Sequence, residues 1–127
     1  MIIGVKREQS SKPAIRPLVQ EVLDKGYLMS LATLDDGGTW VSDVIYIHDD
    51  AFHIYWMSDP RVRHSLAILN NTNVAGTITA SNLGEDNLGI QFAGIASKIE
   101  GPRHDLAKKH YAKRLKKEPK ETDDVLQ

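Results

Sequence analysis

The stretch Phe52–Asn71, FHIYWMSDPRVRHSLAILNN, decides the fold because its pattern changes from strand to helix within twenty residues. Large apolar side chains alternate with other residues from Phe52 to Met57, which is the period-two pattern of a half-buried strand. The segment Ser58-Asp59-Pro60 then predicts a helix start, with a capping side chain followed by proline at the first helical position. Apolar residues continue at helical spacing to Asn70-Asn71, namely Val62, Leu66 and Leu69.

Three basic residues fall in the first turn of this predicted helix: Arg61, Arg63 and His64. Positive side chains are unfavourable there, because the helix start already carries unpaired N–H groups and the positive end of the helix dipole. One explanation is that the arginines pair with Asp59 or with a neighbouring loop. The other is a phosphate cradle, in which Ser58, Arg63 and His64 hold a phosphate monoester at the helix start.

The composition describes one neutral domain over residues 1–127. The formal net charge of −1 argues against a general nucleic-acid-binding protein. The absence of cysteine excludes disulfides and thiolate zinc sites. No apolar run reaches the roughly 20 residues of a membrane span, and the start of the chain lacks a signal-peptide core, so we expect a soluble cytoplasmic protein without membrane contact.

The remaining chain predicts a meander of strands with short flanking helices. The strongest turn is Asp35-Asp36-Gly37-Gly38, because its glycines adopt positive φ at little cost. The predicted strands are 27–34, 39–47, 51–57, 72–80 and 88–100, and the other predicted helices are 17–25 and 105–117. Residues 1–12 are expected to be a flexible arm, and residues 118–127 an acidic tail.

The segment Arg103–Lys117 is strongly basic and leaves only a thin apolar line through Leu106, Tyr111 and Leu115. A solvated helix face, partly neutralised by the acidic tail, explains this composition. The alternative is a non-catalytic binding module that uses this helix to contact RNA or a protein.

Several common chemistries are missing from the sequence. It has no Walker loop, no GxGxxG between strand and helix, and no GxSxG elbow. Its five histidines lack the spacing that places two imidazoles on one metal, so we expect no metal site. A cofactor that brings its own reactivity therefore fits better than side-chain chemistry.

The sequence resembles the pyridoxamine 5′-phosphate oxidase-like FMN-binding split barrels in its motifs and in their order along the chain. These motifs are LATLDDGGTWVSDVIYI, FHIYWMS, RxRHSLAILNN, NVAGTITA and GIQFAGIASKIEG. The resemblance covers about residues 15–117 and is greatest to an uncharacterised branch. It implies an all-β fold, an antiparallel FMN-binding split β-barrel with flanking α-helices, that forms a homodimer with FMN at the subunit interface. The implied activity is that of an oxidoreductase acting on an unidentified small-molecule substrate or electron donor.

Carried onto this chain, the resemblance implies two groups of cofactor-binding residues. Val44, Ile45 and Tyr46 would lie along the flavin ring, with Gln91 as a further contact to the ring or ribityl chain. Ser58, Arg63 and His64 would hold the phosphate. The resemblance assigns no catalytic residue.

The sequence also departs from that family. Asp43 and His48 stand where basic residues often face the flavin, and Arg63-His64 replaces a common Arg-Lys pair. The final strand and the C-terminal segment, which in that family help to form the substrate side of the site, are absent. We therefore expect no vitamin B6 oxidase activity, and the chain to be either a short member of the family or truncated. A haem-binding split barrel is the alternative, with His64 or a histidine of the last helix as axial ligand.

Overall fold

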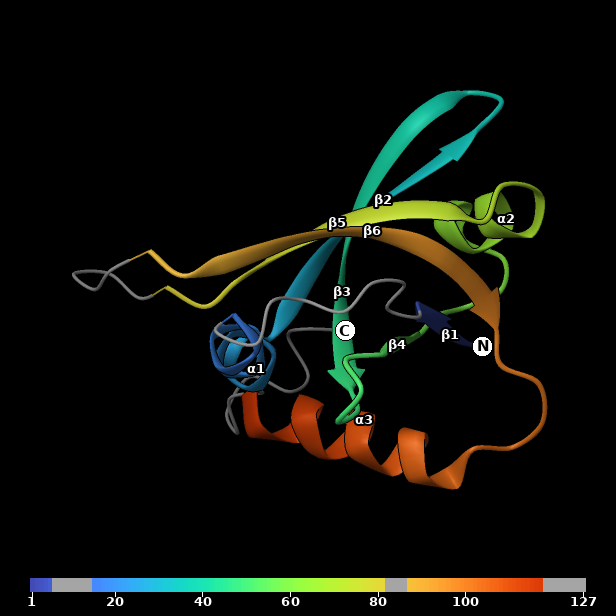
Figure 1. Ribbon diagram of the computed structural model, residues 1–127. Helices are drawn as coiled ribbons and strands as arrows, with labels where there is room; N and C mark the ends of the chain where they lie inside the picture. Colours follow the sequence, from blue (N-terminus) through green and yellow to red (C-terminus); the bar gives the residue numbers. More distant parts are fainter. Residues whose placement is uncertain (6–14, 82–86, 118–127) are drawn as a thin grey trace.

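The computed structural model describes residues 1–5, 15–81 and 87–117, which form six strands and three helices. In chain order these are β1 (Ile2–Val5), α1 (Arg16–Lys25), β2 (Leu28–Asp35), β3 (Gly38–His48), β4 (Ile54–Met57), α2 (Arg63–Asn70), β5 (Asn73–Thr79), β6 (Gly89–Lys98) and α3 (His104–Lys117). The strands close into an antiparallel barrel in the order β1-β4-β3-β2-β5-β6 (Figure 1). This confirms the predicted all-β barrel with flanking helices.

The hairpin between β2 and β3 has the predicted tight turn. Asp35 pairs with Gly38 across it, and Gly38 has a φ of 109°, which a residue with a side chain rarely adopts. The Asp35 carboxylate also accepts a hydrogen bond of 2.8 Å from the Gly37 N–H. The turn thus fixes the register of β2 against β3, the longest pairing in the barrel, and this hairpin extends beyond the other strands (Figure 1).

Residues 1–12 were expected to be a flexible arm, and for residues 2–5 this is wrong. They form β1, which pairs with β4 on one side and β6 on the other and so closes the barrel. Ile3 and Val5 point into the core with 1% and 4% of their surfaces exposed. Four residues are too few for a period to be recognised, although three of the four residues in IIGV are β-branched. The rest of the predicted arm and the tail 118–127 lie outside the described residues.

The barrel is split between β3 and β4. The two strands pair only from Tyr46 to His48, opposite Trp56 to Ile54. Residues 38–45 of β3 therefore have a strand partner, β2, on one side only among the described residues. That leaves backbone N–H and C=O groups along the β3 edge for another partner.

The barrel interior is filled by large side chains from facing strands. Trp56, Tyr46, Met29 and Leu31 have no exposed surface. The Tyr46 hydroxyl donates to the Leu23 carbonyl at 2.8 Å and lies 3.3 Å from that of Val22, both at the end of α1. Burial, followed by the charge of Asp24, raises the pKa of Tyr46, so this hydroxyl stays a donor.

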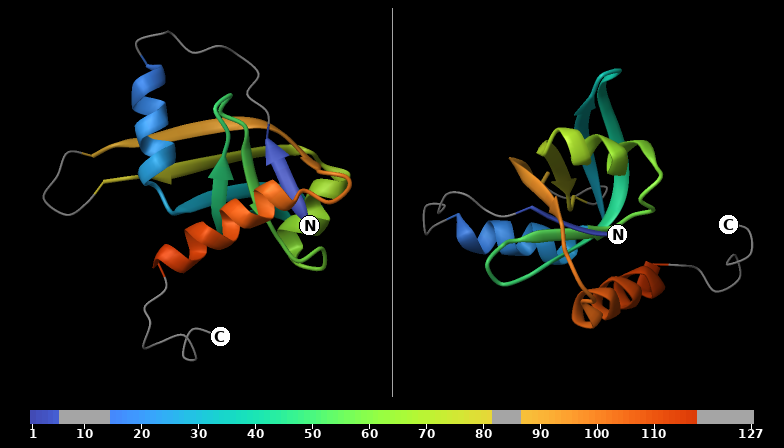
Figure 2. Two further views of the ribbon diagram at one scale, coloured as in Figure 1. Left: turned by 90° about the horizontal axis from the view of Figure 1, so that it is seen from below. Right: turned by 90° about the vertical axis from the view of Figure 1, so that its right-hand side faces the viewer.

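The helices lie around the barrel at different places. α1 and α2 lie toward opposite ends, and α3 runs along the side formed by β3 and β4 (Figures 1 and 2). Lys109 and Lys113 of α3 donate to the carbonyls of His48 and Tyr46, each at 2.6 Å. These ammonium groups satisfy β3 carbonyls beyond the point where pairing with β2 ends, at Ile45.

The start of α2 differs from the prediction. The Asp59 carboxylate accepts a hydrogen bond of 2.8 Å from the Arg61 N–H, which makes a separate turn, and the helix begins only at Arg63. Its buried face consists of Ser65, Ala67 and Ile68. The predicted apolar series is instead exposed, with exposed fractions of 38% for Val62, 51% for Leu66 and 64% for Leu69.

In the part of the chain that the structure describes, none of the helices has the length and apolar character needed to cross a membrane.

Candidate functional site

Three polar side chains meet where β4 ends and α2 begins. Ser58 Oγ lies 2.7 Å from His64 Nε2 and 2.7 Å from Ser65 Oγ. Ser65 is fully buried, while Ser58 and His64 are half-buried. The Ser58 N–H donates to the Met1 carbonyl at 2.8 Å, which holds this residue in line with β1. The structure thus brings together two of the three predicted phosphate-binding residues and adds Ser65.

The start of α2 leaves backbone donors at this cluster. Its N-cap residue is Val62, no side chain caps the first turn, and that turn contains no acidic residue. Helices leave their first N–H groups without partners inside the helix, and these groups carry the positive end of the helix dipole. An oxyanion beside Ser58 and His64 would therefore meet hydroxyl, imidazole and backbone donors.

Burial lowers the pKa of His64. The ring is thus neutral at neutral pH, and a single hydrogen bond joins its Nε2 to the Ser58 hydroxyl. An anion in contact with this ring would favour its charged form and oppose the effect of burial. The cluster is therefore neutral by itself and able to gain a positive charge when an anion binds.

Arg63 points away from this cluster. Its Nε and Nη2 donate to the two carboxylate oxygens of Asp35 at 2.9 and 3.0 Å, and its guanidinium lies 4.4 Å from the centre of the Trp40 ring. The Arg63 hydrogen bond, opposed by partial desolvation, lowers the pKa of Asp35. Arg61 likewise pairs with Asp59 at 2.9 Å. Arg61 thus pairs with Asp59, and Arg63 pairs with a carboxylate of a neighbouring loop. This is the ion pairing given above as the first explanation for the basic residues.

The three predicted ring-binding residues lie at the end of the split. Val44 and Ile45 are half-buried on the part of β3 that β4 does not reach. Tyr46 is different, because its backbone pairs with Trp56 of β4 and its side chain is enclosed in the core. A ligand in the split could therefore contact Val44 and Ile45 but not the Tyr46 ring.

The split and the polar cluster adjoin each other. The β3–β4 pairing ends at Tyr46 and Trp56, after which Met57 and Ser58 continue toward α2. At the other end of the gap, Arg63 of α2 stacks on Trp40 of β3. The unpaired edge of β3 and the start of α2 are therefore two sides of one region.

Gln91 lies away from both the split and the polar cluster. It is exposed on β6 in a row that continues through Thr77 and Ser30 to Asp43. Together with Val41 and Phe92 it lines a hollow of about 370 Å³ to which no member of the polar cluster contributes. The Asp43 carboxylate in that row accepts a hydrogen bond of 2.7 Å from the Ser30 hydroxyl.

The histidines proposed for an axial haem ligand have different surroundings. His104 is exposed at the start of α3. His110 is half-buried, and a hydrogen bond to the Ile45 backbone holds its ring against β3. Burial and the charges of Arg114 and Lys113 lower the pKa of His110. Within the described residues, no group of three or more His, Asp or Glu side chains could hold a metal ion.

Three partners in this region were not predicted: Ser65, Asp35 and Trp40. Ser65 directly follows His64, and a serine among apolar residues on a buried helix face is a signal that could have been noticed. The contacts of Asp35 and Trp40 with Arg63 join residues far apart in the sequence, so no local pattern indicates them.

The barrel order, the short β3–β4 pairing and the helix that begins beside it define a split β-barrel. A solved structure with the same fold aligns with a TM-score of 0.69 and 19% identity, covering 85% of this chain and 74% of that one. HutZ, described as the haem storage protein from Vibrio cholerae, aligns with a TM-score of 0.58 and 18% identity, covering 72% of this chain and 68% of that one.

The sequence is similar to proteins named UPF0306. One from Photorhabdus laumondii is 25% identical over 100 residues, covering 77% of this chain and 70% of the relative. The UPF0306 protein YhbP of Salmonella schwarzengrund is 27% identical over 95 residues, covering 73% of this chain and 65% of the relative. The chain thus spans about two thirds of the length of these curated relatives. No family model matches the sequence.

Proposed function

We propose that this protein binds FMN in the split between β3 and the start of α2 and acts as an oxidoreductase on a small molecule. The observation that carries the proposal is the cluster of Ser58, His64 and Ser65 at an uncapped helix start, next to an unpaired strand edge. A phosphate needs donors of this kind, and a flat heterocycle needs backbone groups along its polar edge.

The donors at the start of α2 fit a phosphate monoester. Such a group carries a charge of about −1.5 to −2 at neutral pH and offers three strong acceptor oxygens. Ser58 and the first-turn N–H groups would donate to it, and His64 would gain a proton beside it. Arg63 directly precedes His64, but its charge is paired with the Asp35 carboxylate, so it would reach the phosphate only by leaving that partner.

The β3 edge fits the ring. Val44 and Ile45 lie on the part of β3 without a β4 partner. The Val44 backbone would pair with the polar edge of the ring system, while the bond from His110 to the Ile45 backbone would be retained. FMN would supply the acceptance and release of hydride or single electrons. The residues identified here would hold and orient the cofactor, and the reductant and substrate stay unassigned.

We further propose that a second copy of the chain covers the face beside the site. Exposed apolar residues lie at the start of α2 and along it, and on the neighbouring β2–β3 hairpin, namely Val62, Leu66, Leu69, Leu34 and Trp40. Leu34 and Leu66 line a groove of about 1110 Å³ between these two elements. Exposed large apolar side chains on neighbouring elements, with polar residues around them, are typical of subunit interfaces. A homodimer would also exclude water from a flavin bound nearby.

Haem is the second candidate, for two reasons. The same barrel occurs in a protein described as a haem storage protein, and His110 is held against β3 by a bond to the Ile45 backbone. Histidines that bind metals commonly use their second ring nitrogen in such a bond, which fixes the orientation of the ring. In this alternative His110 would bind the haem iron axially.

The test is to incubate the purified protein with FMN or with haemin, pass each sample through a size-exclusion column, and record the absorbance of the protein peak. The proposal expects oxidised-flavin bands that co-elute with a dimer. A Soret band without retained flavin, weakened by His110→Ala, would favour haem. Elution as a monomer that retains neither cofactor would contradict both readings.

A further inference from the structure

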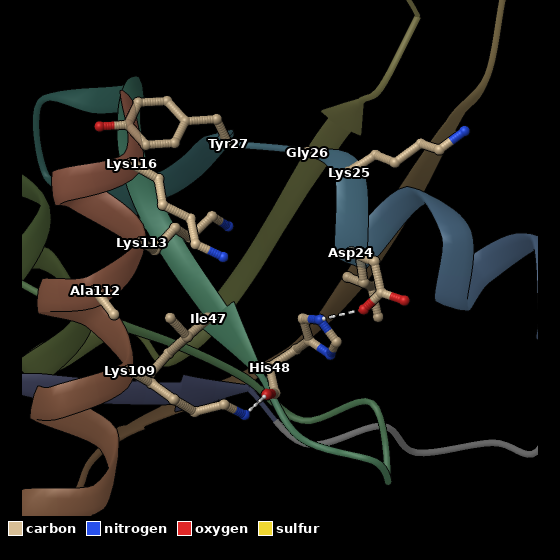
Figure 3. Close-up of a pocket in the computed structure, with 11 residues that line it drawn as sticks. Asp24, Lys25, Gly26, Tyr27, Ile47, His48, Lys109, Ala112, Lys113 and Lys116 are labelled. Atoms are coloured by element: carbon tan, nitrogen blue, oxygen red, sulfur yellow. Dashed lines mark hydrogen bonds and ion pairs between the residues drawn. The ribbon is translucent and has the colours of Figure 1, made fainter. Parts of the chain in front are cut away.

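Another cavity, separate from the split and from the two hollows described above, lies between the end of α1, the end of β3 and the last turns of α3 (Figure 3). Its volume is about 340 Å³. Its lining residues are Leu23, Asp24, Lys25, Gly26, Tyr27, Ile47, His48, Lys109, Ala112, Lys113 and Lys116. None of them belongs to the Ser58 cluster.

Three lysines of one helix face border this cavity. Lys109, Lys113 and Lys116 are spaced by four and three residues, which places them on the same side of α3. Lys113 and Lys116 extend from α3 toward the space in front of α1 (Figure 3). Like charges at this spacing repel one another, so an anion between them would relieve an unfavourable interaction.

Two of these lysines are already fixed in position. Lys109 and Lys113 each donate to a β3 carbonyl at 2.6 Å, and the Lys113 ammonium lies 3.4 Å from the centre of the Tyr46 ring. A carbonyl is a neutral acceptor, so an ammonium group that donates to it keeps its positive charge. The positive charges are thus held at the cavity by the fold rather than spread into solvent.

The single acid of the lining does not neutralise these lysines. Asp24 lies 3.1 Å from His48 Nε2, on the side of the cavity opposite to α3 (Figure 3). Lys25 pairs with Glu21 at 2.9 Å and points away from the other lysines. Three ammonium groups therefore border the cavity from α3 in a chain whose formal net charge is −1.

We propose that this cavity binds a small molecule carrying a phosphate or pyrophosphate group. Lysine ammonium groups bind phosphate oxygens as point charges, and several of them suit an anion with more than one negative charge. The volume suits a small metabolite rather than a macromolecule. This site is independent of the proposed FMN site, because the two share no residue.

The test is a titration of the protein, residues 1–127, with sodium pyrophosphate at constant ionic strength, followed by backbone-amide NMR. Saturable shifts are expected at residues 24–27, 47–48 and 109–116. Lys116→Gln should weaken binding about tenfold, since it removes one charge-assisted contact. Lys108→Gln is the matched control, because Lys108 is an exposed lysine of the same helix that does not line the cavity.

The other arms of the experiment separate the alternatives. His64→Ala should leave these shifts unchanged, which shows that they do not arise from the Ser58 cluster. Citrate should bind with an affinity at least tenfold lower than that of pyrophosphate. An equal loss of affinity in Lys116→Gln and Lys108→Gln would show that binding depends on the net charge of the protein and not on the cavity. That result would overturn the proposal. So would equally strong citrate binding, or linear shifts without saturation up to millimolar pyrophosphate.

Discussion

Trp56→Ala is expected to lower the free energy of unfolding by about 3–5 kcal/mol, the usual cost of removing a large buried aromatic side chain. Trp56 lies on β4 and has no exposed surface. Its backbone pairs with Ile3 of β1 on one side and, on the other, with Tyr46 of β3 in the last pair before the split. The β4 strand has only four residues, so the packing of this ring accounts for much of what holds the strand in place. Urea unfolding followed by circular dichroism measures the loss.

Trp56→Phe is the matched control. Among the described residues the Trp56 Nε1 is buried without a hydrogen-bond partner, so replacing indole by a phenyl ring removes an unsatisfied donor while keeping most of the apolar contact. We expect Phe to cost less than half of the alanine loss. A loss below about 1 kcal/mol for Trp56→Ala would show that β4 is held mainly by its backbone pairing.

His64→Ala is expected to weaken FMN binding about 10- to 100-fold, because a hydrogen bond to a charged group contributes about 1.5–3 kcal/mol. Fluorescence titration of FMN measures the change, since bound flavin differs in emission from free flavin. His104→Ala is the control, because His104 is exposed at the start of α3 and outside the cluster. The same loss in both variants would remove His64 from the proposed site.

Arg63→Ala is expected to weaken FMN binding less than His64→Ala does. Its guanidinium is held by both oxygens of Asp35 and by the Trp40 ring, and it would have to leave these partners to reach the phosphate. A larger loss for Arg63→Ala than for His64→Ala would show that this exchange of partners occurs when FMN binds.

Much of the barrel could be predicted because its signals are local. The alternation in β2 and β3, the Asp35–Gly38 turn and the strand that precedes Ser58 all depend on neighbouring residues. β1 was missed because four residues carry no recognisable period, and its position depends on pairing with β4 and β6. The start of α2 was placed too early because Asp59 makes its own turn with Arg61 rather than capping the helix.

The site was predictable only in part, because only some of its contacts join residues that are near one another in the sequence. Ser58 and His64 meet because both flank the β4–α2 connection, and their spacing is visible in the sequence. The partner of Arg63 is not, since Asp35 lies in a hairpin 28 residues away. The basic face of α3 was predicted to be solvated, but Lys109 and Lys113 bond to β3 carbonyls exposed by the end of the β2 pairing.

The most direct test of the proposed flavin site is a backbone-amide NMR spectrum recorded during titration with FMN. The proposal expects the largest shifts at Val44 and Ile45 and at residues 58–65, which lie on two sides of the split. Shifts confined to residues 24–27 and 109–116 would place the phosphate in the lysine-lined cavity instead. That result, or a spectrum unchanged by saturating FMN, would contradict a flavin site between β3 and α2.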